Sequence, residues 1–164
     1  MQVVDRTATT RPWDAVIAFP KMRVGVQAPG ATVDTIYYLP PEAALLAPRN
    51  ALAERAVRQL ERYRDDPDAP FDLPIAPRGT EFQRKVWDAL MRIPCGTAKT
   101  YGTLAREIGG VARAVGQACG ENHLPIVIPC HRVVAANGLG GFAHSRGGYL
   151  LEAKKWLLGH ERVI

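Results

Sequence analysis

The stretch Val127-Ile128-Pro129-Cys130-His131-Arg132-Val133-Val134 places a cysteine, followed directly by a histidine and an arginine, between two β-branched apolar runs. These runs predict buried extended chain on both sides of the cysteine, and Pro129 removes a backbone donor just before it. The thiolate is the nucleophilic form of cysteine, and basic or cationic neighbours promote its formation. The sequence therefore predicts a reactive Cys130 on a rigid, mostly buried segment.

Neighbouring side chains on extended chain point to opposite faces. We therefore expect that Cys130 and His131 do not touch and that a bridging water carries the thiol proton. The tripeptide Ile93-Pro94-Cys95 repeats the Ile-Pro-Cys pattern, but glycine and threonine follow it. Without a basic neighbour, Cys95 is interpreted as a structural residue in a loop. For Cys130 alone, a buried core cysteine is the competing interpretation.

Composition limits the classes to which the protein can belong. With 164 residues and 47% hydrophobic side chains, the chain can form one mid-sized domain or two small ones. Three cysteines are too few for a disulfide framework, which indicates a reducing compartment. The sequence contains no apolar run of membrane-spanning length, and residues 1–10 lack the apolar core of a signal peptide. We therefore expect a cytoplasmic protein that does not enter a membrane.

Charge is distributed unevenly between the two halves of the chain. Residues 1–76 carry nine Lys or Arg and ten Asp or Glu side chains, whereas residues 77–164 carry twelve and six. The aspartates and prolines between Asp65 and Pro77 predict a linker, so a domain boundary is expected near residue 76. The basic C-terminal half suggests contact with phosphate, although many basic domains bind no nucleic acid.

The N-terminal half predicts a small α/β domain. Three short runs rich in β-branched and aromatic residues, at 15–19, 22–26 and 33–39, are bounded by Pro or Gly and predict an antiparallel sheet. Asn50 can cap a helix that ends near Arg64, and the apolar face of this helix would cover the sheet.

The C-terminal half predicts mainly helices. Thr80-Glu81-Phe82-Gln83 has the form of a capping box and predicts the start of one helix. Residues 101–108 and 111–119 predict two short helices around Gly109-Gly110. This pattern is typical of a helix-turn-helix, and a plain pair of packed helices would produce it too. The small residues of the second helix favour close approach to another surface.

The last part of the chain adds polar candidates to the predicted site. Asn122 could brace the cysteine segment or serve only as a turn former. Residues 137–148 contain five glycines and predict a flexible loop, after which a helix is expected from about 149 to 158. Glu161 could orient a histidine as the third member of a triad, and a solvated terminal charge is the alternative.

Four stretches carry a resemblance to a known family: Thr80-Glu81-Phe82-Gln83-Arg84-Lys85-Val86-Trp87, Thr100-Tyr101-Gly102-Thr103-Leu104-Ala105, Ala112-Arg113-Ala114-Val115-Gly116, and the segment from Asn122 to Val134. In this order they resemble the motifs of the O6-alkylguanine-DNA alkyltransferases, also called methylated-DNA-protein-cysteine methyltransferases. The resemblance implies an α/β N-terminal domain with a small antiparallel sheet plus a helix, ribonuclease-H-like in kind. It also implies a mostly α, winged-helix-like C-terminal domain with a helix-turn-helix.

The family resemblance further implies DNA repair by direct reversal. An alkyl group on O6 of guanine in double-stranded DNA, with O4-alkylthymine as a second candidate, would move to Cys130 and remain there as a thioether. Such a protein acts once, as a monomer, without a cofactor or metal. The zinc ligands of some relatives are absent, because residues 1–94 contain neither cysteine nor histidine.

Carried over by position, the resemblance implies catalytic roles for five residues. Cys130 would accept the alkyl group, and His131 would activate it through water while Glu161 orients the imidazole. Asn122 would hold the cysteine-bearing turn, and Tyr101 would protonate the leaving guanine.

The same comparison implies DNA contacts and a base pocket. The DNA contacts would come from Tyr101, Arg113, Gly116 and Arg84. Among these, Arg113 would fill the gap left by a flipped nucleotide. Val133 and Phe142 would line the pocket for the flipped base.

Three other classes compete with this interpretation. Alkyltransferase-like proteins recognise the same lesion without repairing it, but they lack the acceptor cysteine that this chain has in Cys130. A cysteine hydrolase needs an oxyanion hole and a substrate cleft that the sequence does not indicate. A helix-turn-helix transcription factor would leave the Cys-His-Arg segment unexplained.

Overall fold

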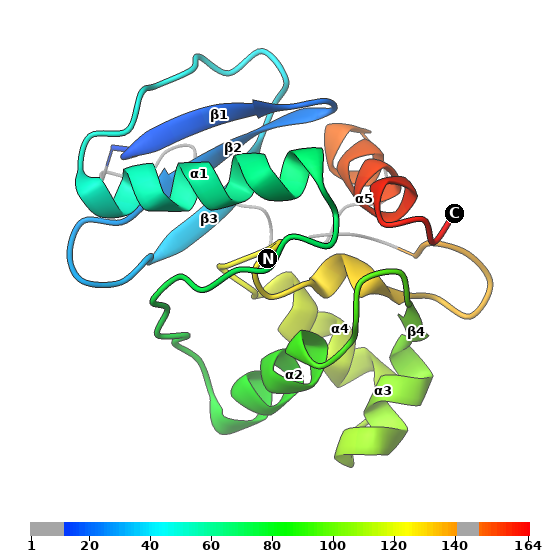
Figure 1. Ribbon diagram of the computed structural model, residues 1–164. Coiled ribbons are helices and arrows are strands. Elements are labelled where there is room, and N and C mark those ends of the chain that lie inside the picture. Colours follow the sequence, from blue (N-terminus) through cyan, green and yellow to red (C-terminus); the bar gives the residue numbers. More distant parts are fainter. Residues whose placement is uncertain (1–11, 141–147) are drawn as a thin grey trace.

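The computed structural model describes residues 12–140 and 148–164 (Figure 1). In chain order its elements are β1 (Ala15–Phe19), β2 (Met22–Gln27), β3 (Thr35–Leu39), α1 (Ala51–Asp65), α2 (Glu81–Met91), β4 (Lys99–Thr100), α3 (Tyr101–Ile108), α4 (Ala112–Gly120), the 3-10 helix η2 (Cys130–Arg132), β5 (Val133–Val134) and α5 (Gly148–His160). Each predicted helix is present. The largest differences from the predicted boundaries are that β3 starts two residues later and that α5 continues to His160.

The N-terminal half is built on a three-stranded antiparallel sheet in the order β1-β2-β3. α1 lies across one face of this sheet, where it contacts β1 and β2 (Figure 1). Asn50 caps the helix as predicted, because its Oδ1 accepts from the Ala53 N–H at 2.8 Å. The face of α1 that carries Ala56 and Leu60 is buried against the sheet. The chain is therefore α/β in this half.

Three helices of the C-terminal half, α2, α3 and α4, pack on one another below the sheet in Figure 1, whereas α5 lies beside the sheet. The capping box at the start of α2 is present in both directions, with Thr80 Oγ1 accepting from Gln83 N and Gln83 Oε1 accepting from Thr80 N. Buried Trp87 of α2 donates its indole N–H to the Ala118 carbonyl of α4 at 2.9 Å. Gly109 ends α3 in the left-handed conformation that glycine tolerates best, with φ of 82°.

Two connections bring the later part of the chain together with the earlier elements. β4 pairs with β5 in parallel, with Thr100 opposite Val134, so the start of α3 lies beside the segment that follows Cys130. α5 contacts both β2 and η2. A single cluster of buried apolar residues includes members from both halves, such as Leu60 and Leu90.

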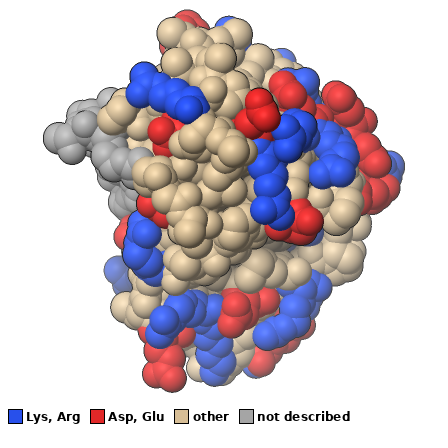
Figure 2. All heavy atoms as spheres, turned by 60° about the vertical axis from the view of Figure 1, so that its left-hand side comes forward, with Lys and Arg blue, Asp and Glu red and all other residues tan. Residues whose placement is uncertain are grey.

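The surface is polar and carries charges of both signs. On the face that Figure 2 shows, Lys and Arg side chains are interspersed with Asp and Glu. Exposed side chains of opposite charge form pairs on α1, such as Arg58 with Glu54 at 3.0 Å. Within residues 12–140 and 148–164, no helix has the length and apolar character needed to cross a membrane.

Candidate active site

The backbone that carries Cys130 differs from the prediction. We expected extended chain, but Ile126 and Val127 form a turn in which Ile128 N donates to Leu124 O at 2.8 Å, and Cys130 begins η2. Ile126 has a φ of 75°, which is uncommon for a β-branched residue. The prediction was wrong because the preference of β-branched residues for strands mainly reflects how their side chains pack and are buried, and only weakly reflects an intrinsic backbone conformation. Here Ile126 and Ile128 reach the core from a turn.

The side chain of Asn122 ties this turn together. Its Nδ2 donates to Ile128 O at 2.8 Å, and its Oδ1 accepts from Leu124 N at 2.9 Å. Cys130 N also donates to Ile128 O at 2.8 Å. The backbone before the cysteine is therefore held at both ends of the turn by one amide side chain.

Cys130 is 6% exposed, and the nearby cation is a lysine that sequence reasoning missed. Burial raises the pKa of the Cys130 thiol, whereas the Asn122 amide and the ammonium of Lys154 lower it. Lys154 is fully buried on α5, and its Nζ donates to Val133 O at 2.8 Å and to Leu139 O at 2.9 Å. Burial lowers the pKa of Lys154 to about 8, and the nearby thiols oppose that change. Lys154 thus places a positive charge near the Cys130 thiol.

The sequence does contain a signal for Lys154. It lies four residues after Leu150 and three before Leu157, on the face of α5 that both of these residues bury. A lysine at such a position interrupts the apolar stripe of a helix, and lysines are almost never fully buried without partners. This exception to the pattern indicates a functional or paired cation.

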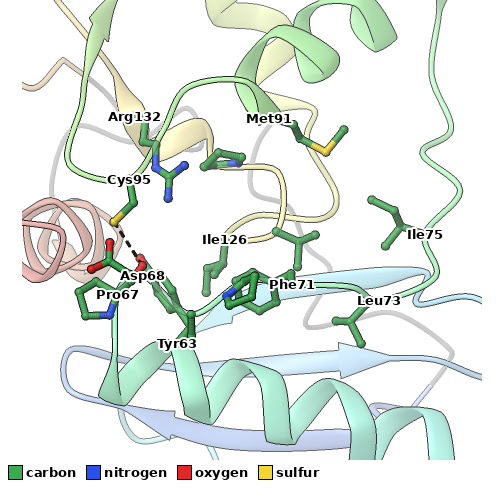
Figure 3. Close-up of a pocket in the computed structure, with 14 residues that line it drawn as sticks. Tyr63, Pro67, Asp68, Phe71, Leu73, Ile75, Met91, Cys95, Ile126 and Arg132 are labelled. Carbon is green, nitrogen blue, oxygen red and sulfur yellow. Dashed lines mark hydrogen bonds between the residues drawn. The ribbon is translucent and has the colours of Figure 1, made fainter.

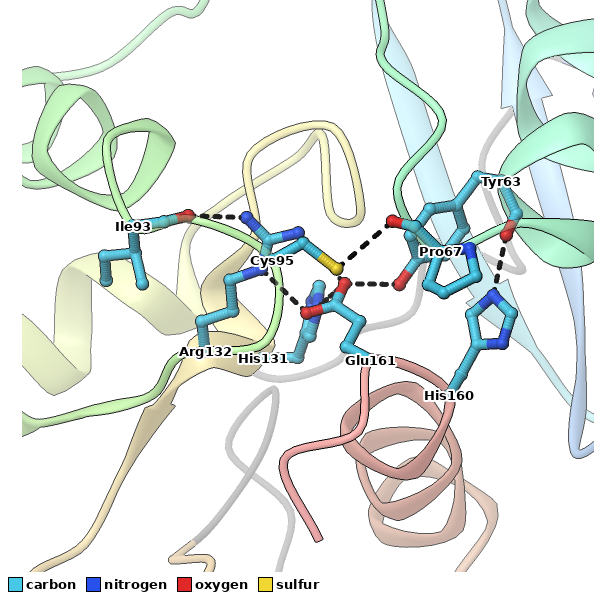
Figure 4. Close-up of polar contacts among 8 residues, drawn as sticks. All are labelled: Tyr63, Pro67, Ile93, Cys95, His131, Arg132, His160 and Glu161. Atoms are coloured by element: carbon cyan, nitrogen blue, oxygen red, sulfur yellow. Dashed lines mark hydrogen bonds and ion pairs between the residues drawn. The ribbon is translucent and has the colours of Figure 1, made fainter.

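Glu161 is fully buried and accepts hydrogen bonds from several side chains (Figure 4). Its Oε2 lies 2.8 Å from His131 Nε2, 3.0 Å from Arg132 Nη2 and 2.6 Å from the Tyr63 hydroxyl. Its Oε1 accepts from Arg132 Nε at 2.8 Å. Burial raises the pKa of Glu161, but the bonds from His131 and Arg132 outweigh burial and hold the pKa well below its ordinary value. Glu161 is therefore an ionised, fully bonded carboxylate rather than a solvated terminal charge.

The ionised carboxylate determines the tautomer of His131. A carboxylate without a proton can only accept, so His131 Nε2 must donate and Nδ1 keeps its lone pair. Among the described residues, Nδ1 is buried and has no hydrogen-bond partner. Burial lowers the pKa of His131, and Glu161 partly opposes that change. His131 is therefore a neutral imidazole whose Nδ1 can accept a proton, and neither ring nitrogen hydrogen-bonds Cys130.

Arg132 does not serve the thiol, although the sequence suggested that it would. Its guanidinium donates to both oxygens of Glu161, and Nη1 donates to Ile93 O at 2.6 Å (Figure 4). The planar guanidinium has the geometry for such paired bonds to a carboxylate. Arg132 therefore holds Glu161 in place, and the cation near Cys130 is Lys154.

Tyr101 opens α3 next to the same group of side chains. Lys154 Nζ lies 5.8 Å from the centroid of the Tyr101 ring. Burial raises the pKa of Tyr101, and Cys119 and Cys130 raise it further. The phenol is therefore protonated at neutral pH and can donate a proton or a hydrogen bond.

Of the four residues expected to contact DNA, the two arginines are exposed, whereas Tyr101 and Gly116 are partly buried. Arg113 near the start of α4 and Arg84 on α2 are both exposed. A Cβ atom added to Gly116 of α4 would meet no heavy atom within 4 Å. Val133 is buried, and its carbonyl accepts from Lys154. Phe142, in the predicted flexible loop, lies outside the described residues.

A cavity of about 380 Å³ lies next to the segment that precedes Cys130 (Figure 3). Its walls include Tyr63, Phe71, Cys95, Pro129 and Arg132, but not Cys130 itself. The Cys95 thiol donates to Pro67 O at 3.2 Å, and burial raises its pKa to about 11. These features fit the structural role expected for Cys95. Within the described ranges, no group of three or more His, Cys, Asp or Glu side chains could hold a metal ion.

Several known proteins are similar to this chain in sequence, and several solved structures are similar to it in fold. The chain is 47% identical over 106 residues to a methylated-DNA–protein-cysteine methyltransferase of Methanosarcina acetivorans, covering 63% of this chain and 65% of that relative. It is 45% identical over 115 residues to the constitutive enzyme of that name from Bacillus subtilis, covering 68% and 67%. The match thus spans just under two thirds of the first relative.

Among solved structures, the Mycobacterium tuberculosis protein OGT in complex with DNA superposes with a TM-score of 0.71. The two are 32% identical, and the superposition covers 90% of this chain and 91% of that one. A family model described as the DNA-binding domain of 6-O-methylguanine DNA methyltransferase matches residues 81–163. This matched region carries Cys130, His131 and Glu161. The chain therefore belongs to the 6-O-methylguanine DNA methyltransferase family.

Proposed function

We propose that this protein repairs alkylated DNA by direct reversal, moving an alkyl group from O6 of guanine to its own Cys130. The observation that carries the proposal is the buried Cys130, with the cation of Lys154 nearby and a neutral His131 that Glu161 holds from behind. A thiol in these surroundings is prepared for nucleophilic attack. The presence of this cysteine favours transfer over the recognition of a lesion without repair.

The first step forms the thiolate of Cys130. The thiol proton passes through water to Nδ1 of His131, which is free to accept it because Nε2 donates to Glu161. Glu161 stabilises the resulting imidazolium, and Lys154 stabilises the thiolate. Asn122 keeps the cysteine at a fixed position during this step.

In the second step the sulfur attacks the alkyl carbon. A bond between sulfur and carbon forms while the bond between that carbon and O6 breaks, and its electron pair leaves with guanine. Tyr101 donates a proton to the leaving base and regains one from solvent, as His131 releases its own. The reaction balances without a cofactor, and the thioether product is stable, so each molecule acts once.

Access to the base requires that the nucleotide leave the duplex, because O6 of guanine is otherwise enclosed by the stacked pairs. We assign α3 and α4 to a helix-turn-helix whose second helix enters the minor groove. Arg113 would fill the gap in the stack, Gly116 would allow close approach, and Arg84 would contact phosphate. Val133 and Phe142 would line the pocket that receives the base.

The wider architecture follows the same proposal. Residues 1–76 form a ribonuclease-H-like domain with its linker, and residues 77–164 form a winged-helix-like domain that carries the acceptor cysteine. The protein acts as a monomer in the cytoplasm on double-stranded DNA with an O6-alkylguanine, and O4-alkylthymine is a second candidate substrate. Its family membership and basic C-terminal half support this assignment.

Mass spectrometry tests the proposed transfer directly. The protein is mixed with a duplex that contains one O6-methylguanine, or with the same duplex carrying plain guanine. We expect one added methyl group per chain with the first duplex and none with the second. Trypsin leaves Cys119 and Cys130 on one peptide, residues 114–132, so fragment ions must locate the methyl group. An unmodified protein, or a methyl group on Cys119, contradicts the proposal.

The Gly116→Ala variant tests close approach of α4 to DNA. Alanine is about 1 kcal/mol more favourable than glycine inside a helix, and the added Cβ meets open space in the free protein. We therefore expect a more stable protein whose affinity for the lesion duplex falls about tenfold, since overpacking of a close contact costs about 1–3 kcal/mol. Thermal unfolding and fluorescence anisotropy measure the two effects.

Gly159→Ala is the matched control. Gly159 lies in α5, and a Cβ atom there would also meet open space. This variant should gain similar stability and keep its affinity for DNA. Equal affinities of both variants and the unchanged protein would show that Gly116 does not approach DNA closely.

A further inference from the structure

We propose that Tyr63, on the N-terminal helix α1, is a positioning residue for the triad and controls alkyl transfer through Glu161. This inference rests on the proposed function and extends it to the N-terminal half, which the match to residues 81–163 does not include. The hydroxyl of Tyr63 donates to Glu161 Oε2 at 2.6 Å across 98 positions of sequence (Figure 4). Both side chains are buried.

The carboxylate oxygen that accepts from Tyr63 distinguishes this hydrogen bond from an ordinary packing contact. Tyr63 donates to Oε2, the same oxygen that accepts from His131 Nε2. Hydrogen bonds to one oxygen share its negative charge, so each donor changes how strongly the others are held. The Tyr63 hydroxyl therefore acts on the histidine through the carboxylate that lies between them.

Tyr63 is itself held firmly at this position. Its carbonyl lies 2.7 Å from His160 Nε2, and its ring packs edge-on against the His160 ring at 5.2 Å. The His160 ring in turn stacks on the ring of Trp156, with 4.5 Å between the ring centroids. Phe71 of the linker lies 5.7 Å from the Tyr63 ring. These contacts from α5 and the linker leave the hydroxyl little freedom to move away from Glu161.

Other charged and titratable groups also face the triad. Arg132 of η2 binds both oxygens of Glu161, and Lys154 of α5 acts on His131. Tyr38 of β3 and Cys95 of the loop after α2 lie within electrostatic reach of Glu161. Burial raises the pKa of both, so they are neutral near pH 7 and leave Arg132 and Lys154 as the neighbouring charges. Besides His131 itself, Tyr63 is a neutral donor that reaches Glu161 directly, and it comes from the N-terminal half.

The Tyr63→Phe variant removes this donor and keeps the aromatic ring. Without the hydroxyl, Oε2 retains more negative charge, which favours the imidazolium form of His131. A protonated His131 cannot take the thiol proton, so we expect transfer at acidic pH, below the pKa of His131, to slow about tenfold, which corresponds to a rise of about one unit in that pKa. The rate should recover at higher pH, and affinity for the lesion duplex should stay unchanged.

Two reactions of Cys130 provide the measurement. One is methyl transfer from the O6-methylguanine duplex, and the other is alkylation by iodoacetamide, which needs no DNA. Rates of both are followed from pH 5 to 9 by mass spectrometry, and NMR of the His131 ring nitrogens reports its titration. We expect the Tyr63→Phe variant to shift both rate profiles and the His131 titration to higher pH. Tyr149→Phe, which removes a phenol hydroxyl elsewhere at the start of α5, is the matched control and should shift neither.

A double-mutant cycle separates positioning from packing. If Tyr63 acts through Glu161, the loss of its hydroxyl should have no further effect in a Glu161→Gln background. Effects that add in the double variant would overturn the proposal, as would a folded Tyr63→Phe protein whose rates and profiles match the unchanged protein. A lack of methyl transfer by the unchanged protein would instead contradict the proposed repair function, and the iodoacetamide reaction would still report on Tyr63.

Discussion

Replacing Glu161 by glutamine is expected to slow alkyl transfer about a thousandfold, because an amide in the place of a triad carboxylate favours the wrong histidine tautomer. An amide nitrogen that faces His131 donates a hydrogen bond and cannot accept one. Nε2 would therefore have to accept, and the ring would carry its proton on Nδ1 instead. That nitrogen could then no longer accept the thiol proton. Single-turnover kinetics with the O6-methylguanine duplex measure the rate, and anisotropy checks that the variant still binds DNA.

The same variant should be less stable. Removing one charge of a buried pair leaves Arg132 without its anion and typically costs about 3–5 kcal/mol. Because the pKa of Glu161 is held below its ordinary value, the carboxylate stabilises the fold above about pH 4.3, and this contribution declines as the pH falls further. Urea unfolding at several pH values should show that acid-dependent loss in the unchanged protein but not in the variant.

Glu107→Gln is the matched control for the loss of a carboxylate. Glu107 pairs with Lys99 at 2.7 Å on the surface, and its side chain is 46% exposed. Exposed pairs contribute about 0–1 kcal/mol, so this variant should keep its stability and its transfer rate. If Glu161→Gln behaved like Glu107→Gln, the carboxylate would have no role in the reaction.

Replacing Lys154 by methionine is expected to slow transfer near pH 7 about a hundredfold. Lys154 provides the positive charge that lowers the pKa of Cys130 against the effect of burial. Loss of an opposite charge close to an ionisable group typically raises an acid's pKa by about 1–3 units, and two units reduce the thiolate population about a hundredfold. The pH profile of iodoacetamide alkylation at Cys130 should therefore move upward.

Lys154 should make the unchanged protein more stable as the pH rises, which is the opposite of a lysine whose pKa is raised by a salt bridge. The pKa of Lys154 is about 8 in the fold and about 10.4 in the unfolded chain, so the unfolded state binds more protons between these values. The unchanged protein should thus gain about 3 kcal/mol relative to Lys154→Met as the pH rises from 8 to 10.4, at about 1.4 kcal/mol per pH unit. Thermal or urea unfolding across this range measures the difference.

Lys155→Met tests whether any lysine at this part of α5 would have the same effect. Lys155 is the next residue, its side chain is 48% exposed, and it lies 3.5 Å from Glu152. We expect neither its transfer rate nor the pH dependence of its stability to change. Equal behaviour of the two methionine variants would exclude a specific role for Lys154.

Local sequence was sufficient for the elements whose signals lie within a few residues. The capping box at Thr80 and the cap at Asn50 form bonds over three positions, so the local sequence predicts both. The turn at Gly109 likewise depends on one residue that tolerates a positive φ. The local Cys-His-Arg pattern predicted a reactive Cys130. Its relation to His131 and Glu161 came from a family resemblance, because no local pattern indicates that His131 and Glu161 meet.

The segment around Cys130 shows where local signals failed. Its β-branched residues predicted a strand, but they form a turn and a 3-10 helix because their burial depends on the surrounding elements. Lys154 and Tyr63 looked like members of helical faces, and only the packing of α1 and α5 against η2 brought them to the site. Sequence alone thus determined the helices, their caps and the family to which the chain belongs. The tertiary structure decided the charge around that cysteine, because the bonds that set it join residues up to 98 positions apart.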